Sequence, residues 1–282
     1  MFGEKVVTLQ FKTEKSVKIK QVLEALERFA PLPLQESWDN AGLQIGLTEA
    51  EVSGALLCLD VTETVIDEAV RRGCNLVVSH HPLLFRGLKQ VSDQTDVQRT
   101  VRKAIKADVS VISMHTNLDS ARGGVNWKIA ERLGLQQVHF GQEQEDSALC
   151  GSPAESGQWV MGDLPQPLEA RAFVALVKER MEAESAMCNE LLRRPIRRVA
   201  ICGGAGDFLT DEVIARGADA FITGEMHYHQ YFGHEQQLQL CVIGHYESEH
   251  YTKELLRDII ERDCPGVRCL LCETNTNPIK YL

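Results

Sequence analysis

The chain has 282 residues, 44% of them hydrophobic, which is enough for one large domain or two smaller domains with a buried core. Its formal net charge is −10, whereas a nucleic-acid-binding surface needs clustered lysine and arginine, so we expect no nucleic-acid partner. The nine cysteines are scattered and odd in number, which indicates reduced thiols in a cytoplasmic protein. No apolar run reaches the roughly 18 residues of a membrane span, so we expect no membrane partner.

Helices and strands alternate in the first part of the chain. Residues 1–16 are polar and rich in lysine, and we expect a short N-terminal arm there. Helical spacing of apolar residues predicts a first helix over 17–29, which Pro31 and Pro33 end. Beyond it, apolar runs and helical spacing predict strands at 55–59, 76–79 and 109–113 and helices at 62–72, 97–106 and 124–133. This alternation is typical of β-α-β units and a mainly parallel sheet.

The alternation returns near the C-terminus. Residues 140–190 are expected to connect two halves without an inserted domain, and they include a polar stretch at 141–157, a short strand at 159–162 and a helix at 168–181. The segments that follow are predicted strands at 198–202, 220–223, 238–243 and 267–271 and predicted helices at 211–216 and 251–262.

An internal repeat relates the two parts. Residues 67–79 align with residues 211–223 without a gap. Downstream, the run from His115 to Asp119 matches the run from His245 to Glu249, since both are His-x-x-x-carboxylate and both follow an apolar strand. The period is too long for a solenoid. We therefore predict an α/β fold of two related halves, 17–139 and 191–282, with mainly parallel sheets.

Imidazoles and carboxylates follow most of the predicted strands. Ligands of parallel α/β sheets bind beyond the carboxyl ends of the strands, so the residues at these exits are candidates for a site. In chain order they are Asp60, then His80 and His81, then His115 and Asp119, then Glu225 and His227, and finally His245 and Glu249. Their number at the strand exits favours a site at these ends of the strands.

The side-chain types at these exits favour a metal site. Histidine with aspartate or glutamate, without cysteine, suits divalent ions such as zinc, manganese, iron or cobalt. Five or six ligands from both halves indicate two ions that share a carboxylate, about 3.5–4 Å apart, which together can activate a water molecule.

Structural interpretations of the same residues stay open. A single histidine after a strand is often only hydrogen-bonded, and Asp119 or Glu249 could cap a helix or complement its dipole. Gly203-Gly204-Ala205-Gly206 could cradle a phosphate through backbone N–H groups, but it lacks the spacing of a nucleotide-binding fingerprint, and a plain strand-to-helix turn is the alternative.

The chain resembles the Nif-three-like family of dinuclear-metal proteins, some members of which are named type 2 GTP cyclohydrolase I homologues. The resemblance extends from about residue 17 to the C-terminus. It is carried by five motifs, namely Glu36-Ser37-Trp38-Asp39-Asn40-Ala41-Gly42-Leu43-Gln44-Ile45-Gly46, Ser79-His80-His81-Pro82, His115-Thr116-Asn117-Leu118-Asp119, Thr223-Gly224-Glu225-Met226-His227 and Gly244-His245-Tyr246-Glu247-Ser248-Glu249.

The resemblance implies a site with two divalent metal ions between the halves. On the matching positions the ligands would be His80, His81, Asp119, His245 and Glu249, and zinc, manganese or iron would fit them. It also implies a homo-oligomer, a toroidal hexamer whose metal sites face an internal cavity. His115 and Glu225 are kept as acid/base candidates.

These features predict a metal-dependent hydrolase. A water molecule of lowered pKa would attack a small substrate, a nucleotide or a cyclic amide as in a GTP cyclohydrolase, while His115 or Glu225 moves the proton. Two alternatives are a metal-binding regulatory or interaction scaffold without catalysis and a metal store or carrier.

Overall fold

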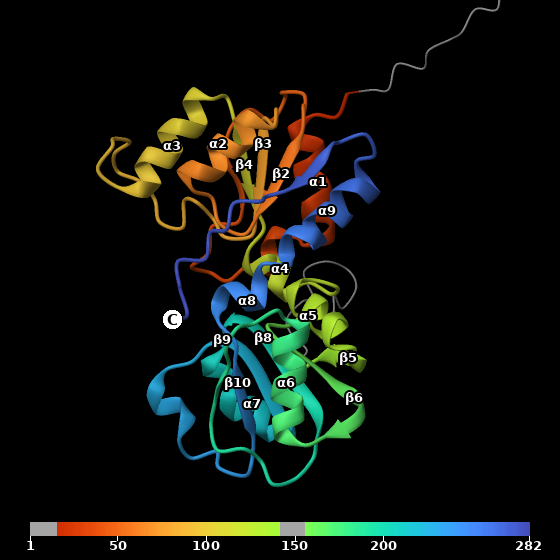
Figure 1. Cartoon of the computed structure of the whole chain (residues 1–282). Coiled ribbons are helices and arrows are strands. Elements are labelled where there is room, and N and C mark those ends of the chain that lie inside the picture. Colours follow the sequence, from red (N-terminus) through yellow and green to blue (C-terminus); the bar gives the residue numbers. More distant parts are fainter. Residues whose placement is uncertain (1–15, 142–155) are drawn as a thin grey trace, which may run out of the picture.

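The computed structural model describes residues 16–141 and 156–282 of the chain. Residues 1–15 of the predicted N-terminal arm and most of the predicted polar stretch at 141–157 lie outside the described residues. The described residues form two lobes, one above the other in Figure 1, and each lobe is built on one sheet with helices on its faces. This confirms the predicted α/β class with two sheet-bearing halves.

The first sheet has five strands, and every pairing except that of β1 is parallel. Every residue of the three central strands is buried, which explains their continuous apolar runs in the sequence. Helices α2 (Glu63–Arg71) and α3 (Asp96–Lys106) cover one face, and α1 (Ile19–Phe29) and α9 (Thr252–Asp263) cover the other. The strands in spatial order are β1 (Gly42–Ile45), β4 (Ser110–Ser113), β3 (Leu76–Ser79), β2 (Ala55–Cys58) and β11 (Cys269–Leu271).

The second sheet has six strands around a parallel centre. Strands β8, β9 and β10 are parallel, and the outer strands pair with them or with each other in antiparallel fashion. Helices α5 (Val125–Leu133) and α6 (Ala170–Arg180) pack on one face and α7 (Thr210–Ala215) on the other. The strands in spatial order are β5 (Gln136–Phe140), β6 (Val160–Leu168), β8 (Ile196–Ala205), β9 (Ala220–Glu225), β10 (Gln239–Val242) and β7 (Met187–Cys188).

The two lobes share an order of elements. Each lobe has three successive parallel strands, and a short antiparallel strand pairs with the third of them. This short strand is β1 in the first lobe and β7 in the second. The aligned segments of the predicted repeat occupy equivalent places, since one forms α2 and β3 and the other α7 and β9. The repeat itself stays a prediction from the sequence.

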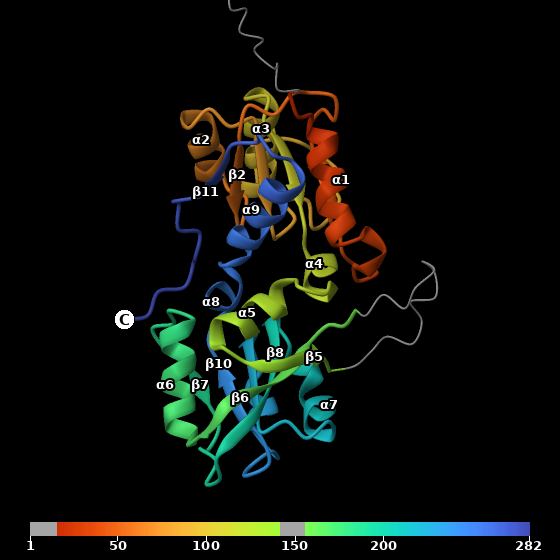
Figure 2. The ribbon, with the colours of Figure 1, turned by 90° about the vertical axis from the view of Figure 1, so that its right-hand side faces the viewer.

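Each half of the chain sends one helix and one strand to the other lobe. Helix α5 and strand β5 follow the first set of parallel strands but belong to the second lobe, as Figure 2 shows, and α9 and β11 return to the first lobe. The predicted boundaries at 17–139 and 191–282 therefore do not follow the lobes. The segment 140–190, expected to be a connector, supplies β6, α6 and β7 to the second lobe.

Backbone pairing is the physical reason for this difference. Strand β11 runs parallel to β2, with Cys269 opposite Ala55 and Leu271 opposite Leu57. Spacing in the sequence predicts that a strand exists but not which sheet edge it joins.

A single cluster of buried apolar side chains runs through both lobes. It takes residues from α1 and α9 of the first lobe and from α5 and α6 of the second. The lobes are therefore packed against each other through a common core. None of the helices in the described parts of the chain is both long and apolar enough to cross a membrane.

Candidate metal centre

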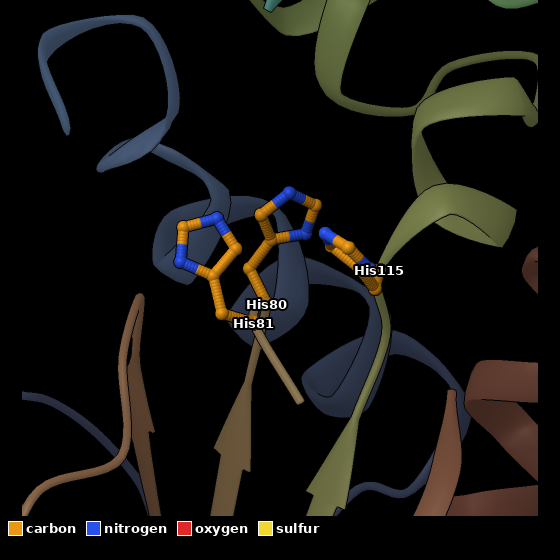
Figure 3. Close-up of side chains that lie close together, drawn as sticks. All are labelled: His80, His81 and His115. Carbon is orange, nitrogen blue, oxygen red and sulfur yellow. The ribbon is translucent and has the colours of Figure 1, made fainter. Parts of the chain in front are cut away.

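The carboxyl ends of the parallel strands of both sheets face each other between the lobes, where the short helices α4 (Thr116–Ser120) and α8 (His245–Glu249) lie (Figure 1). His80 and His81 follow β3, and His115 lies between β4 and α4. Figure 3 shows these three imidazoles gathered at the ends of the neighbouring strands, and their ring centroids are 5.0 to 5.5 Å apart. The fold thus brings together residues that lie far apart in the sequence.

The buried carboxylate of Glu249 lies at the centre of the cluster. Its Oε2 atom is 2.9 Å from Nε2 of His81 and 3.0 Å from Nε2 of His245. Its Oε1 atom faces the other way, 3.7 Å from Nε2 of His80. Glu249 therefore presents one oxygen to a histidine pair and the other to His80.

Two atoms beside Glu249 are buried without a hydrogen-bond partner. They are Nε2 of His80 and Oδ1 of Asp119, which face each other at 3.5 Å. A buried polar atom without a partner costs free energy, and few survive in folded proteins without a reason. A divalent cation between these atoms would satisfy both, so the residues present fit a metal ion.

The three histidines around Glu249 are also held from behind. Nδ1 of His80 donates to the carbonyl of Met114 at 2.7 Å. Nδ1 of His81 donates to Asp60 at 2.7 Å, and Nδ1 of His245 donates to Glu225 at 2.8 Å. An oxygen acceptor behind each ring fixes the tautomer and leaves Nε2 free for a ligand bond, as is usual for histidines that bind metals.

The electrostatics of the cluster favour a positive charge. Burial lowers the pKa of His81, but its hydrogen bonds to Asp60 and Glu249 outweigh this and raise the pKa to about 10. The pKa of His245 is raised to about 9 in the same way, because the bond to Glu249 outweighs burial. Burial opposes ionisation of Glu249, yet its three histidine neighbours hold the pKa of this carboxyl well below its usual range. These interactions favour protonated histidines beside Glu249 when no metal is bound, and a divalent ion would compete with those protons.

Three groups of side chains have ligand atoms close enough to hold an ion. They are His80, Asp119 and Glu249; His81, His245 and Glu249; and His80, His81 and His115. All five predicted ligands and His115 thus lie together. Glu225 lies outside these groups behind His245, with its side chain 57% exposed.

His115 is oriented by a carboxylate that sequence reasoning missed as a site residue. Nδ1 of His115 donates to Oδ1 of Asp39 at 2.7 Å, while Oδ2 of Asp39 accepts from the backbone N–H of Thr116 at 3.1 Å. Burial opposes ionisation of Asp39, but these bonds and the Thr116 hydroxyl lower its pKa to about 2. Asp39 lies within the Trp38-Asp39-Asn40 part of the first motif, and this motif was the sequence feature that could have identified it as a site residue.

Asp60 and Thr276 support the cluster from further away. Asp60 holds His81, and its second oxygen accepts from the Thr276 hydroxyl at 2.6 Å. Asp60 was visible in the sequence as a strand exit, whereas Thr276 carried no signal. A cavity of about 680 Å³ opens beside the cluster and is lined by residues of both lobes.

Known proteins resemble this chain over most of its length. The sequence profile of the family described as Duf34/NIF3 (NGG1p interacting factor 3) matches residues 17–278. A GTP cyclohydrolase 1 type 2 homolog of Clostridium acetobutylicum is 31% identical over 272 residues, which cover 94% of this chain and 99% of that protein. A protein of the same name from Campylobacter jejuni is 30% identical, with 85% of this chain and 90% of that protein covered.

Solved structures share the fold. The crystal structure of Staphylococcus aureus protein SA1388 matches with a TM-score of 0.85 at 27% identity and covers 94% of this chain and 99% of that one. The Bacillus cereus protein related to NIF3 matches with a TM-score of 0.84 at 22% identity, covering 95% of this chain and 100% of that one. The second likeness concerns the fold alone.

Proposed function

Because the chain belongs to the Duf34/NIF3 family, we propose that it is a two-metal hydrolase that acts on a small molecule. The names of the relatives, GTP cyclohydrolase 1 type 2 homolog, support a reaction on a nucleotide or a cyclic amide. The observation that carries the proposal is the convergence of three histidine Nε2 atoms on the two oxygens of Glu249, with an oxygen acceptor behind every ring.

Glu249 would be shared by two ions. His80, Asp119 and Oε1 of Glu249 would hold one of them, and His81, His245 and Oε2 would hold the other. The donor set suits zinc, manganese or iron. Two divalent ions bound there would supply a water molecule of lowered pKa and would polarise the bond under attack.

The chain's own residues would move the proton and hold the geometry. His115 lines the cavity, and because Asp39 occupies its Nδ1, its Nε2 is the nitrogen that can accept or donate a proton there. Glu225 was an acid/base candidate, but its bond to Nδ1 of His245 favours a role in orienting that ligand.

The test is a substrate screen with metal-loaded protein. GTP and cyclic amides would be incubated with the zinc, manganese and iron forms, beside a His81→Ala variant. We expect ring opening or hydrolysis that the variant loses together with its metal. Activity that survives metal loss would rule out this mechanism, and a metal-free variant that keeps its full cellular function would favour an interaction scaffold.

Two further expectations belong to the same proposal. The family resemblance implies a toroidal hexamer. Light scattering, which measures the mass of the assembly in solution, tests this expectation. A cytoplasmic location agrees with the eight described cysteines, all of which are free thiols.

A further inference from the structure

Three aromatic side chains stand exposed around the cavity beside the metal cluster. Trp38 and Phe85 belong to the first lobe and Phe208 to the second, and their exposures are 57%, 44% and 61%. The Trp38 and Phe85 rings are 5.7 Å apart, and Trp38 lies 6.1 Å from the ring of His115. Exposed aromatic surface in a cavity gains free energy when a flat apolar ring covers it.

The same cavity has little to offer a polyphosphate. Its lining, within the part of the chain that the structure describes, contains no lysine or arginine, whereas it contains Glu36, Asp119 and Glu249. Each histidine of the lining, His81, His115 and His245, is already paired with a carboxylate. Proteins bind phosphate groups through cationic side chains or free backbone N–H groups.

The glycine-rich turn of the cavity does not replace those cations. The N–H of Gly203 donates to Oδ1 of Asn126 at 2.8 Å, and the N–H of Gly204 donates to Oγ of Ser248 at 3.0 Å. The N–H of Gly206 donates to the Thr223 hydroxyl at 3.0 Å. These donors are already used within the protein, so the turn is a structural one.

Bound metal ions would not leave a surplus of positive charge either. Two divalent ions carry four positive charges, and at least as many carboxylates lie in or directly behind the cluster. They are Asp39, Asp60, Asp119, Glu225 and Glu249. A triphosphate would therefore meet a site whose charge is already balanced.

We propose that this cavity selects a planar heteroaromatic ring without a triphosphate, with the ring against Trp38 and Phe85 on one side and near Phe208 on the other. The reacting group would then lie at the His115 end, next to Glu249. That the ring reacts in this cavity rests on the function proposed above. That the cavity binds the ring rests on the aromatic side chains of its walls. The names of the relatives contain GTP, a triphosphate, whereas this proposal assigns recognition to the ring and none to the triphosphate.

Titration with matched compounds tests this proposal. Guanosine and GTP share a ring and differ in the triphosphate, and quinazolin-4-one is a neutral bicyclic ring without a sugar. Binding would be followed by calorimetry in the zinc-loaded and the metal-free protein. We expect guanosine or quinazolin-4-one to bind, GTP to bind no more tightly than guanosine, and Trp38→Ala and Phe208→Ala each to weaken ring binding roughly tenfold.

Matched controls keep the result interpretable. Tyr228 is an aromatic residue of the second lobe that is 72% exposed and does not line the cavity, so Tyr228→Ala should leave the affinity unchanged. Tenfold tighter binding of GTP than of guanosine, unchanged affinity in both cavity variants, or no binding of either ring at millimolar concentration would overturn the proposal. If the wild-type protein binds the ring but does not bind metal, the result would refute only the proposed two-metal hydrolase and would leave the proposal of ring recognition standing.

Discussion

At the scale of single residues, the candidate site depends on histidines whose two ring nitrogens both face an oxygen atom. His80, His81 and His245 each direct Nε2 toward Glu249 and donate Nδ1–H to an oxygen behind the ring. A neutral imidazole has one donor and one acceptor nitrogen, so once Nδ1–H is donated behind the ring, a deprotonated Nε2 can offer its lone pair to an ion in the site. The metal interpretation therefore rests on both nitrogens of each ring.

The Asp39–His115 pair leads to a test of proton transfer. Asp39→Asn would keep the shape of the side chain but weaken its hold on Nδ1 of His115. We expect the hydrolysis rate to fall between roughly tenfold and a hundredfold, with the metal content unchanged, because Asp39 contacts none of the five predicted ligands. Rates and metal per chain would be measured beside Asp93→Asn, an exposed aspartate. A parallel loss of metal and rate would assign Asp39 to the metal cluster.

The sequence predicted most of the residues of this site but few of their supporting contacts. His80, His81, Asp119, His245 and Glu249 are among the residues that follow predicted strands, which can be recognised locally, and the family resemblance implied these five as ligands. The supporting hydrogen bonds, from His81 to Asp60, from His115 to Asp39 and from Thr276 to Asp60, join residues 21 to 216 positions apart. No local pattern encodes such distances, so these partners appear only in the folded chain.

At the scale of elements, the buried carboxylate of Glu68 anchors the segment after β11 to helix α2. It accepts from the backbone N–H groups of Glu273 and Thr274, both at 2.9 Å, and from the Arg72 guanidinium at 2.7 Å. Although burial opposes its ionisation, these bonds lower the pKa of Glu68 to about 2. The anchored segment carries Thr276, which supports Asp60 in the site.

This anchor makes stability depend on pH with a defined sign. A folded-state pKa below the ordinary value of 4.5 means that Glu68 stabilises the fold above that pH and loses this effect as the pH falls toward about 2. We expect Glu68→Gln to lower the free energy of unfolding by about 2 kcal/mol at pH 7, with the difference from wild type shrinking below pH 4.5.

Urea unfolding at several pH values measures this effect. Glu24→Gln, at an exposed position of helix α1, serves as the control and should change the stability little at any pH. A Glu68→Gln deficit that is equal at pH 3 and pH 7 would mean that packing, rather than the charge, is responsible.

Several elements could not be predicted at their full length. Strand β6 reaches from Val160 to Leu168, but Pro165 and Pro167 lack an N–H group, and its pairing with β8 is interrupted between Asp163 and Leu168. Helices α4 and α8 have five residues each, too few for a helical period to show in the sequence. The longer amphipathic helices, such as α1 and α3, were predicted to within two residues.

At the scale of the whole molecule, the exchange of α5 and α9 joins the lobes into one core. Leu256 of α9 is completely buried, and α9 packs against α1 and β2 of the first lobe. The helix exchanged in the other direction, α5, carries Trp127 in the second lobe. A substitution that destabilises one lobe should therefore also lower the stability of the other.

Leu256→Ala tests the common core. Removal of this side chain should destabilise the protein by roughly 2–5 kcal/mol in a single transition. Tryptophan fluorescence, which reports on Trp38 of the first lobe and on Trp127 and the buried Trp159 of the second, should shift its urea midpoint together with circular dichroism. Val70→Ala, at an exposed position of α2, should leave both midpoints in place. Separate transitions would show that the lobes unfold independently.

The measurement that tests the central claim most directly is the metal content per chain, by elemental analysis before and after reconstitution with zinc, manganese or iron. Because Glu249 serves both groups of ligands, we expect about two ions in the wild type, about one or fewer in His81→Ala, and almost none in Glu249→Ala. Glu261→Ala, at an exposed position of α9, should keep both ions. A wild-type content near zero after reconstitution would contradict the account and leave the histidines with a structural role.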